Sequence, residues 1–306
     1  MCENSMADRL FNVFNVVLLA LMAIITIFPI YYVVIVSFTE PTEYIRKGMV
    51  LFPEHWSLES YSYLLSTHAF PKALGVSATL AIVGTVCSLL ITSSFSYALS
   101  RKRMQGRRVL LLMVLFTILF SPGIIPNYIL IREFGLINSL WSVILVSLTN
   151  GWYVILMKGF FESIPESLDE AAAIDGSNDI YTWFRIILPL SDPARAAFGL
   201  FFAVSYWNQY FNALLYLNDP DKWPIQVLLQ NMLVEASGSS LETDDPFRQP
   251  PPSETLKMAA VVIAIVPIIC VYPFLQKHFA KGVMVGSLIR KFMIYINRCS
   301  SWKVRI

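Results

Sequence analysis

Aromatic and amide side chains gather inside one apolar run of the chain. Between Ser205 and Asn212 the sequence reads Ser-Tyr-Trp-Asn-Gln-Tyr-Phe-Asn. Amides hydrogen-bond to hydroxyl groups, and flat rings cover the apolar C–H face of a pyranose, so this composition suits a sugar. We predict a substrate pathway lined by Asn150, Tyr206, Trp207, Asn208, Tyr210 and Asn212. Two alternatives stay open, namely an aromatic belt at the membrane interface and amides that bond one helix to another.

Residues that would support catalysis are scattered along the chain. The three histidines and four cysteines are His55, His68, His278, Cys2, Cys87, Cys270 and Cys299, without the spacing of a metal site. The sequence contains no phosphate-binding loop, no Gly-x-Ser-x-Gly and no His-Glu-x-x-His. We therefore predict a protein that is not an enzyme and that has no cofactor of its own.

The composition indicates an integral membrane protein. Of 306 residues, 56% are hydrophobic and 14% charged, and the formal net charge of +2 gives no case for nucleic-acid binding. About 20 residues are needed to cross roughly 30 Å of hydrocarbon. Six runs are long enough, which predicts an all-α polytopic fold with spans near 13–37, 74–99, 109–131, 140–160, 196–217 and 256–276.

Prolines are expected to disturb three of these spans. Pro29 and Pro267 should kink the first and the last, and Pro122 and Pro126 should break the third. In a bilayer, a broken helix is tolerated only where protein or a water-filled cavity takes up the freed backbone groups. The third span therefore either borders a solute path or has a kink that its neighbours absorb.

Basic residues set the predicted orientation. Five of the 23 Lys and Arg residues lie in the short loop 100–108. Cytoplasmic loops of membrane proteins carry an excess of these residues. We therefore expect a multi-pass membrane protein with both termini, and also the segment 163–190, in the cytoplasm.

The segment 163–190 separates the fourth and fifth spans and is polar. Ser163 and Glu166 have the spacing of a capping box, and the helix dipole favours acidic residues such as Asp169 in the first turns. Gly176 is a suitable left-handed stop. Ser177 or Asn178 can cap a second helix, 179–187, that ends before Pro189. The sequence thus predicts a cytosolic helix-turn-helix whose first helix has a smooth alanine surface.

The same segment resembles the EAA signature of ABC importer permease subunits. The matching residues are Glu170, Ala171, Ala172, Gly176, Ile186, Leu188 and Pro189. The resemblance implies that the first helix is a coupling helix, which docks on a partner subunit that hydrolyses ATP. These seven residues are our predicted coupling site, and ATP and Mg²⁺ are expected to bind to the partner subunits.

The resemblance extends over most of the chain, from about Leu10 to Gly286. It is closest to the permeases of oligosaccharide and polysaccharide uptake. The matching segments are 206–208, 211–214, 222–224, 256–259, 272–277 and 281–286. It implies a bacterial cell membrane, a second homologous permease, two ATP-binding subunits, an extracytoplasmic solute-binding protein and an oligosaccharide substrate. In related permeases the tail that matches 281–286 also touches the ATP-binding subunits.

Three regions outside the spans leave alternatives open. The outer loop 38–71, with a short helix expected at 58–65, is either solvated or a landing surface for an external partner. The outer loop 218–255 is expected to be an irregular polar excursion. The extension 287–306 departs from the family pattern, and is either incidental or a basic segment that lies on membrane lipid.

The sequence therefore predicts a permease domain over 1–286 that translocates oligosaccharides and is driven by partner ATPases through 163–190. A membrane-embedded enzyme would need clustered catalytic groups at membrane depth, and none is visible. A proton-coupled carrier usually needs a charged group in mid-span, and none is present in the central part of any span. Sodium coupling through backbone carbonyls stays open.

Overall fold

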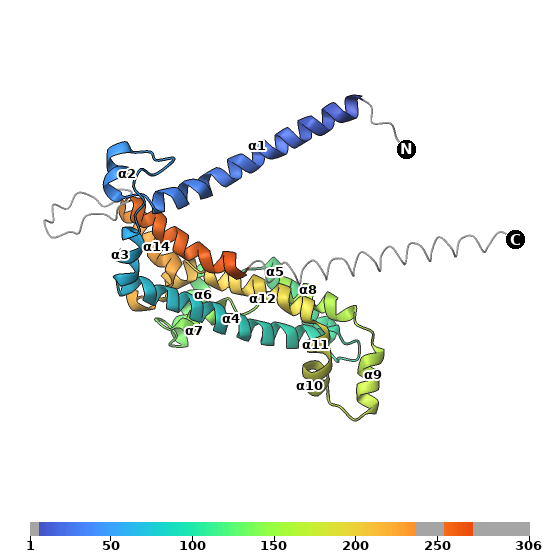
Figure 1. The fold of residues 1–306 in the computed structure, drawn as a ribbon. Helices are drawn as coiled ribbons and strands as arrows, with labels where there is room; N and C mark the ends of the chain where they lie inside the picture. The colour runs from blue at the N-terminus through green and yellow to red at the C-terminus, as the bar shows by residue number, and fades with distance from the viewer. Residues whose placement is uncertain (1–5, 237–253, 272–306) are drawn as a thin grey trace. The chain divides into compact units, whose positions relative to one another are not determined.

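The computed structural model describes residues 6–236 and 254–271 (Figure 1). Within these residues all named elements are helices, and one isolated β-bridge joins Thr39 to Trp56, which confirms the predicted all-α fold. The chain divides into two compact units, residues 1–71 with 228–266 and residues 72–227 with 267–306. The helices are α1 (Met6–Ser37), α2 (Pro41–Lys47), α3 (Glu59–Ser66), α4 (Ala69–Ser100), α5 (Arg107–Leu119), α6 (Ile124–Glu133), α7 (Leu140–Val146), α8 (Gly151–Glu162), α9 (Ser167–Ile174), α10 (Asp179–Thr182), η1 (Trp183–Ile187), α11 (Leu188–Leu190), α12 (Asp192–Trp207), α13 (Phe211–Tyr216), η2 (Pro220–Lys222), α14 (Ile225–Ala236) and Glu254–Val271.

Three of the described helices are long and apolar enough to cross a membrane alone. They are Leu10–Ser37, Ala69–Ser100 and Glu254–Val271. Three bent pairs also qualify by length and composition, so the described residues hold three spans, or up to six if each pair is one span. In one pair, Asp179–Leu190 meets α12 at 88° and so does not continue it. The helices continue through Pro29 and Pro267, and the kinks expected there stay a prediction.

The third predicted span is broken, as expected. α5 ends at Leu119, α6 begins at Ile124, and the two are bent by 116°. Pro122 lies in the break, and Gly123 leaves it with a φ of 84°. Pro126 lies in the first turn of α6, where the missing N–H has no helical partner to lose. One proline therefore lies at the break and the other is tolerated after it.

Two more breaks interrupt spans that were expected to be continuous. α7 and α8 are bent by 58° across residues 147–150, and α12 and α13 are separated by residues 208–210. The Asn150 side chain accepts a hydrogen bond from the Tyr153 N–H at 3.1 Å, which caps α8. The Asn208 side chain donates to the Val204 carbonyl at 2.9 Å, at the end of α12. Asparagine competes in this way with the helical backbone, so both breaks follow from local chemistry.

The two loops that were predicted to lie outside contain helices. α3 confirms the short helix expected near 58–65. The prediction of an irregular excursion at 218–255 is wrong for residues 225–236, which form α14. Ile225, Val227 and Leu229 are buried. Apolar burial, rather than the prolines and acids farther along this loop, decides the structure there.

Side chains of α4, α7, α8 and α12, with single residues of other elements, build the core of the unit that contains residues 72–227. Phe198, Phe202 and Tyr206 repeat every four residues along one face of α12 and are buried. A Cβ atom on Gly84 of α4 would lie 2.7 Å from the Tyr206 ring. α4 and α12 therefore approach closely through a glycine, a common device of helix packing in membranes.

Candidate functional site

The predicted coupling segment forms a helix, a sharp turn and a second helix beyond the ends of α4 and α8 (Figure 1). Its first helix, α9, does not begin with the predicted capping box. The Ser163 hydroxyl instead donates to the Phe160 carbonyl at 2.6 Å and so closes α8. Glu166 is the residue before α9, with no side-chain capping bond. The spacing predicts the capping box wrongly because α8 extends as far as Glu162 and uses Ser163 for its own end.

The two faces of α9 differ. Asp169 and Ala172 are buried, whereas Glu170 and Ala171 are exposed. Ile174, at the end of the helix, has 86% of its surface exposed. The first two residues of the EAA signature therefore point outward, and the third packs inward.

Gly176 ends α9 in the left-handed conformation, with a φ of 81°. Its N–H donates to the Ala173 carbonyl at 3.1 Å, and the Ser177 N–H donates to the Ala172 carbonyl at 2.9 Å. These two bonds form a Schellman motif. The predicted stop at Gly176 is confirmed, and it fixes the direction in which the chain leaves α9.

The second helix starts as predicted and ends later than predicted. The Asn178 side chain accepts from the Tyr181 N–H at 2.8 Å and caps the helix. The helix continues through Pro189 to Leu190 because residues 183–187 adopt a π-helix, in which the Leu188 N–H bonds to the Trp183 carbonyl five residues back. The wider turn makes room for the proline ring. Of the remaining predicted coupling residues, Leu188 is buried, Ile186 is half-buried and Pro189 is exposed.

A buried triad holds α9 against the end of α4, and we call it the α4–α9 latch. The Tyr97 hydroxyl donates to the Asp169 carboxylate at 2.9 Å, and Arg101 forms an ion pair with the same carboxylate. The Arg101 guanidinium lies over the Tyr97 ring, 4.6 Å from its centre. The Arg101 and Asp169 side chains are each 8% exposed. The latch therefore joins a predicted coupling helix directly to a long membrane-type helix.

Sequence reasoning misses this triad. It assigns Asp169 to the helix dipole and Arg101 to membrane orientation, and it gives Tyr97 no role. Tyr97 and Asp169 lie 72 residues apart in sequence. The basic loop was visible, but no local pattern shows which of its residues turns inward.

Two exposed ion pairs add to the latch. Lys102 lies 3.1 Å from Glu166, and Arg103 pairs with Asp179. Three consecutive basic residues after α4 thus each pair with an acid of the segment 163–190. Apolar side chains are exposed on the same segment, namely Ile174, Ile180, Tyr181 and Phe184. An apolar surface rimmed by charge is typical of a protein interaction site.

The predicted substrate-pathway residues have different surroundings. Tyr206 is buried, and its hydroxyl lies 2.9 Å from the Ser88 hydroxyl and donates to the Ile144 carbonyl at 3.1 Å. Trp207 is buried and Tyr210 is half-buried. Tyr206 is thus a packing residue in this structure, although its polar end has partners.

The amides lie at the breaks of the fourth and fifth spans. Gln209 and Asn212 donate to the Ser147 hydroxyl at 2.9 and 3.3 Å. Asn208 is exposed, and its side chain accepts a bond from Gln226 at 3.3 Å. Ser147 and Gln209, which were not predicted, thus join the two breaks, and Asn150 caps the helix that follows the first. That these groups contact a sugar stays a prediction.

The sequence and the overall fold both match known proteins. A family model described as the inner membrane component of binding-protein-dependent transport systems matches residues 3–285. The chain belongs to this family. Its members are permease subunits of ABC importers, so the chain is a membrane transport component rather than an enzyme, and ATP hydrolysis belongs to a separate subunit. The alternatives of a membrane-embedded enzyme and an ion-coupled carrier are thereby set aside.

Individual relatives cover almost the whole permease chain. The polygalacturonan/rhamnogalacturonan transport system permease protein YtcP of Bacillus subtilis is 43% identical over 92% of this chain and 99% of its own length. Protein LplC of the same organism is 40% identical over 93% and 97%. A solved bacterial ABC transporter involved in the import of the acidic polysaccharide alginate has a chain that is 32% identical, with a TM-score of 0.82, over 91% of this chain and 100% of that one.

Proposed function

We propose that this permease belongs to an ATP-driven importer for oligosaccharides that contain uronic acids. Its partners are a second homologous permease, two ATP-binding subunits that hold ATP and Mg²⁺, and an extracytoplasmic solute-binding protein. The chain itself carries no cofactor, and both of its ends face the cytoplasm. The observation that carries the proposal is the segment 163–190, which is fixed by the α4–α9 latch and exposes a charged and apolar outer surface.

The ion pairs support the proposed orientation. Arg101, Lys102 and Arg103 pair with acids of the segment 163–190, so the most basic loop and this segment lie on the same side of the membrane. The usual excess of basic residues on cytoplasmic loops supports placing that side in the cytoplasm. The coupling surface then faces the compartment that contains ATP.

The proposed mechanism is alternating access. The binding protein delivers the sugar on the outer side, and ATP closes the two ATP-binding subunits. Their closure moves α9 through Glu170 and the exposed alanine face. The latch passes this displacement to α4, because Asp169 is bound by Tyr97 of α4 and by Arg101, the residue that follows α4. Hydrolysis then resets the spans.

The substrate class follows from the relatives, and the pathway chemistry from this chain. YtcP and the alginate transporter are named for polysaccharides of uronic acids. This chain offers neutral amides at its breaks and no basic residue in the central part of a span. We therefore assign recognition of the carboxylates to the binding protein or the second permease, and contact with hydroxyl groups to the amides of this chain.

Uptake by the assembled importer tests this proposal. We expect ATP-dependent uptake of short oligogalacturonates into vesicles that contain both permeases, the ATP-binding subunits and the binding protein. Neutral malto-oligosaccharides of the same length are the matched control, and their uptake should be at least tenfold slower. Equal uptake of both sugars would refute the substrate class, and uptake that needs no ATP would refute the coupling.

Asn208→Ala is expected to lower sugar uptake several-fold without reducing the yield of the complex. Asn208 is exposed, and its donated bond is local, to Val204, so little packing is lost. Tyr206→Ala is the contrast, because removing a buried aromatic ring costs about 3–5 kcal/mol and should lower the yield of folded complex. Uptake kinetics and complex yield are the two measurements. Unchanged kinetics in Asn208→Ala would move the sugar contact elsewhere.

A further inference from the structure

A closed lobe follows α1 directly, and we call Thr39–Ser57 the outer lobe. Its base is closed by the bridge between Thr39 and Trp56, and the Ser57 N–H donates to the Phe38 carbonyl at 2.8 Å. The lobe contains α2 and a return loop. It is therefore a folded element rather than a loose connection.

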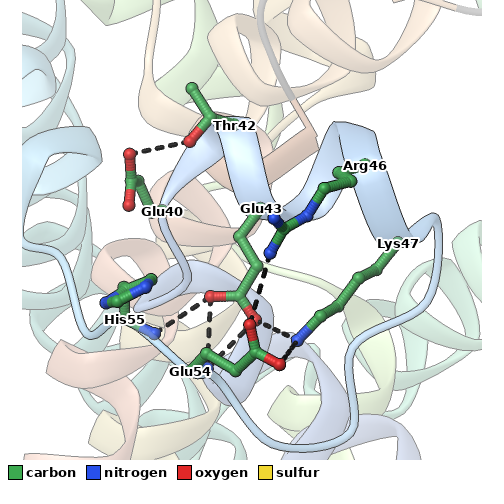
Figure 2. A network of polar contacts seen from close by, with 7 residues as sticks. All are labelled: Glu40, Thr42, Glu43, Arg46, Lys47, Glu54 and His55. Carbon is green, nitrogen blue, oxygen red and sulfur yellow. Dashed lines mark hydrogen bonds and ion pairs between the residues drawn. The ribbon is translucent and has the colours of Figure 1, made fainter.

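One carboxylate pins the return loop to α2 (Figure 2). Glu43 is buried, and it accepts hydrogen bonds from the Glu54 N–H, the His55 N–H and the Lys47 ammonium group, each at about 3 Å. The bond from Lys47 and the two backbone bonds lower the pKa of Glu43 to about 2. The stability that this lowered carboxyl pKa contributes is complete above the ordinary value of 4.5, and it is lost as the pH falls from there through about 2. Glu43 thus stays ionised at any physiological pH, and we call this carboxylate with its three hydrogen-bond donors the clamp.

The clamp leaves an apolar tip at residues 48–53. Gly48 ends α2 with a φ of 70°, and Val50 is buried. Met49, Leu51 and Phe52 point outward, with 60%, 51% and 70% of their surfaces exposed. Three large apolar side chains on one short loop are an unusual surface for a segment in water.

A hydrogen bond sets the level of this tip along α1. The Tyr31 hydroxyl donates to the Leu51 carbonyl at 2.9 Å. Tyr31 precedes the last residue of α1, Ser37, by six positions, or about 9 Å along the helix axis. The lobe therefore folds back along α1 rather than continuing away from it.

This position of Tyr31 along α1 corresponds to the edge of a bilayer. The candidate span Leu10–Ser37 has 28 residues, more than the roughly 20 that cross the hydrocarbon, so a span that enters the hydrocarbon at Leu10 leaves it near Pro29. Tyr31 and Tyr32 follow at once, where aromatic belts occur. Leu51 lies beside this belt, so its neighbours Met49 and Phe52 are at interfacial depth.

We propose that residues 48–53 form an interfacial membrane anchor, with Met49, Leu51 and Phe52 inserted among the lipids at the outer end of α1. The proposal rests on the membrane location of the family, and only the choice of leaflet depends on the proposed orientation. Lipid is the occupant because the apolar tip lies beside the exposed apolar surface of α1, so the bilayer that contacts α1 can also contact the tip.

The charges of the lobe favour contact with apolar lipid over contact with phosphate groups. Arg46 and Lys47 both pair with Glu54, at 3.3 and 2.8 Å. Insertion should therefore depend on the three apolar side chains and be the same in zwitterionic and anionic membranes. A partner protein seated on the tip would be a different occupant, and the experiment below separates it.

The test measures the depth of a spin label in the assembled importer in phospholipid vesicles. The four native cysteines are replaced by serine, and Phe52→Cys or the control Thr42→Cys is labelled. Thr42 is exposed at the start of α2, near the base of the lobe. Collision with oxygen, which enters bilayers, is compared with collision with a water-soluble nickel complex.

We expect the label at Phe52 to collide at least fivefold less with nickel than the label at Thr42, and more with oxygen, in both phosphatidylcholine and phosphatidylglycerol vesicles. Glu43→Ala in the Phe52→Cys protein should raise nickel collisions, because the clamp no longer holds the tip. Equal nickel collisions at both sites would overturn the anchor. Protection from both reagents at Phe52 would also overturn it, in favour of a protein partner. This test does not measure sugar uptake, so failure of the proposed anchor can be distinguished from failure of the proposed function.

Discussion

Asp169→Ala is expected to lower sugar uptake by at least tenfold and to leave ATP hydrolysis by the assembled importer insensitive to the loaded binding protein. The substitution leaves the Arg101 guanidinium buried without its acid. Removing one partner of a buried ion pair costs roughly 3–5 kcal/mol. Among the described residues, Nε and Nη2 of Arg101 already have no hydrogen-bond partner, so no second acceptor can replace the carboxylate. α9 should therefore stay bound to the ATP-binding subunit, while α4 no longer follows the movement of α9.

Two control variants separate transmission from folding. Glu166→Ala breaks the exposed pair with Lys102, which joins the same two segments, and should change uptake less than twofold, since exposed pairs contribute about 0–1 kcal/mol. Arg101→Leu with Asp169→Leu removes both buried charges. It should restore the yield of complex that the unpaired Arg101 lowers, but it should not restore the coupling. The measurements are yield, ATP hydrolysis and uptake. A normal ratio of uptake to hydrolysis in Asp169→Ala would show that the latch is only structural.

The parts of the site that sequence predicts are those fixed by neighbours along the chain. The stop at Gly176 and the cap at Asn178 depend on bonds within a few residues, and both are confirmed. The break at Pro122 follows from the geometry of proline itself. Local rules fail at Ser163, which serves the end of α8 instead of the start of α9, and at Pro189, which a π-helix accommodates.

The parts that sequence does not predict depend on distant contacts. Nothing near Asp169 shows that its carboxylate meets Tyr97 and Arg101. The meeting of Ser147 with Gln209 similarly joins two breaks from different spans. α14 differs in kind, because the prediction rested on the prolines and acids farther along the loop and did not consider the apolar residues 225–229. In these three cases, tertiary packing decides the role of the residue.

Gly176→Leu is expected to leave the protein in the membrane at its normal level while uptake falls about tenfold. Gly176 has a φ of 81°, and a Cβ atom there would meet nothing within 4 Å. The effect is therefore conformational, since a left-handed backbone costs an L-residue roughly 1–2 kcal/mol. The turn can relieve that strain only by giving up the two bonds of the Schellman motif. The second helix then leaves α9 at a different angle, and a displacement of α9 is not passed on correctly.

Two further substitutions decide whether the angle matters. Gly176→Asn should stay within twofold of the native uptake, because asparagine tolerates the left-handed region. Gly135→Leu imposes similar strain at a φ of 66°, also with open space around it, but at the end of α6. It should lower thermal stability by a similar amount while keeping the ratio of uptake to ATP hydrolysis. If Gly135→Leu and Gly176→Leu lower that ratio equally, the strain acts through stability, and the turn after α9 has no special part in coupling.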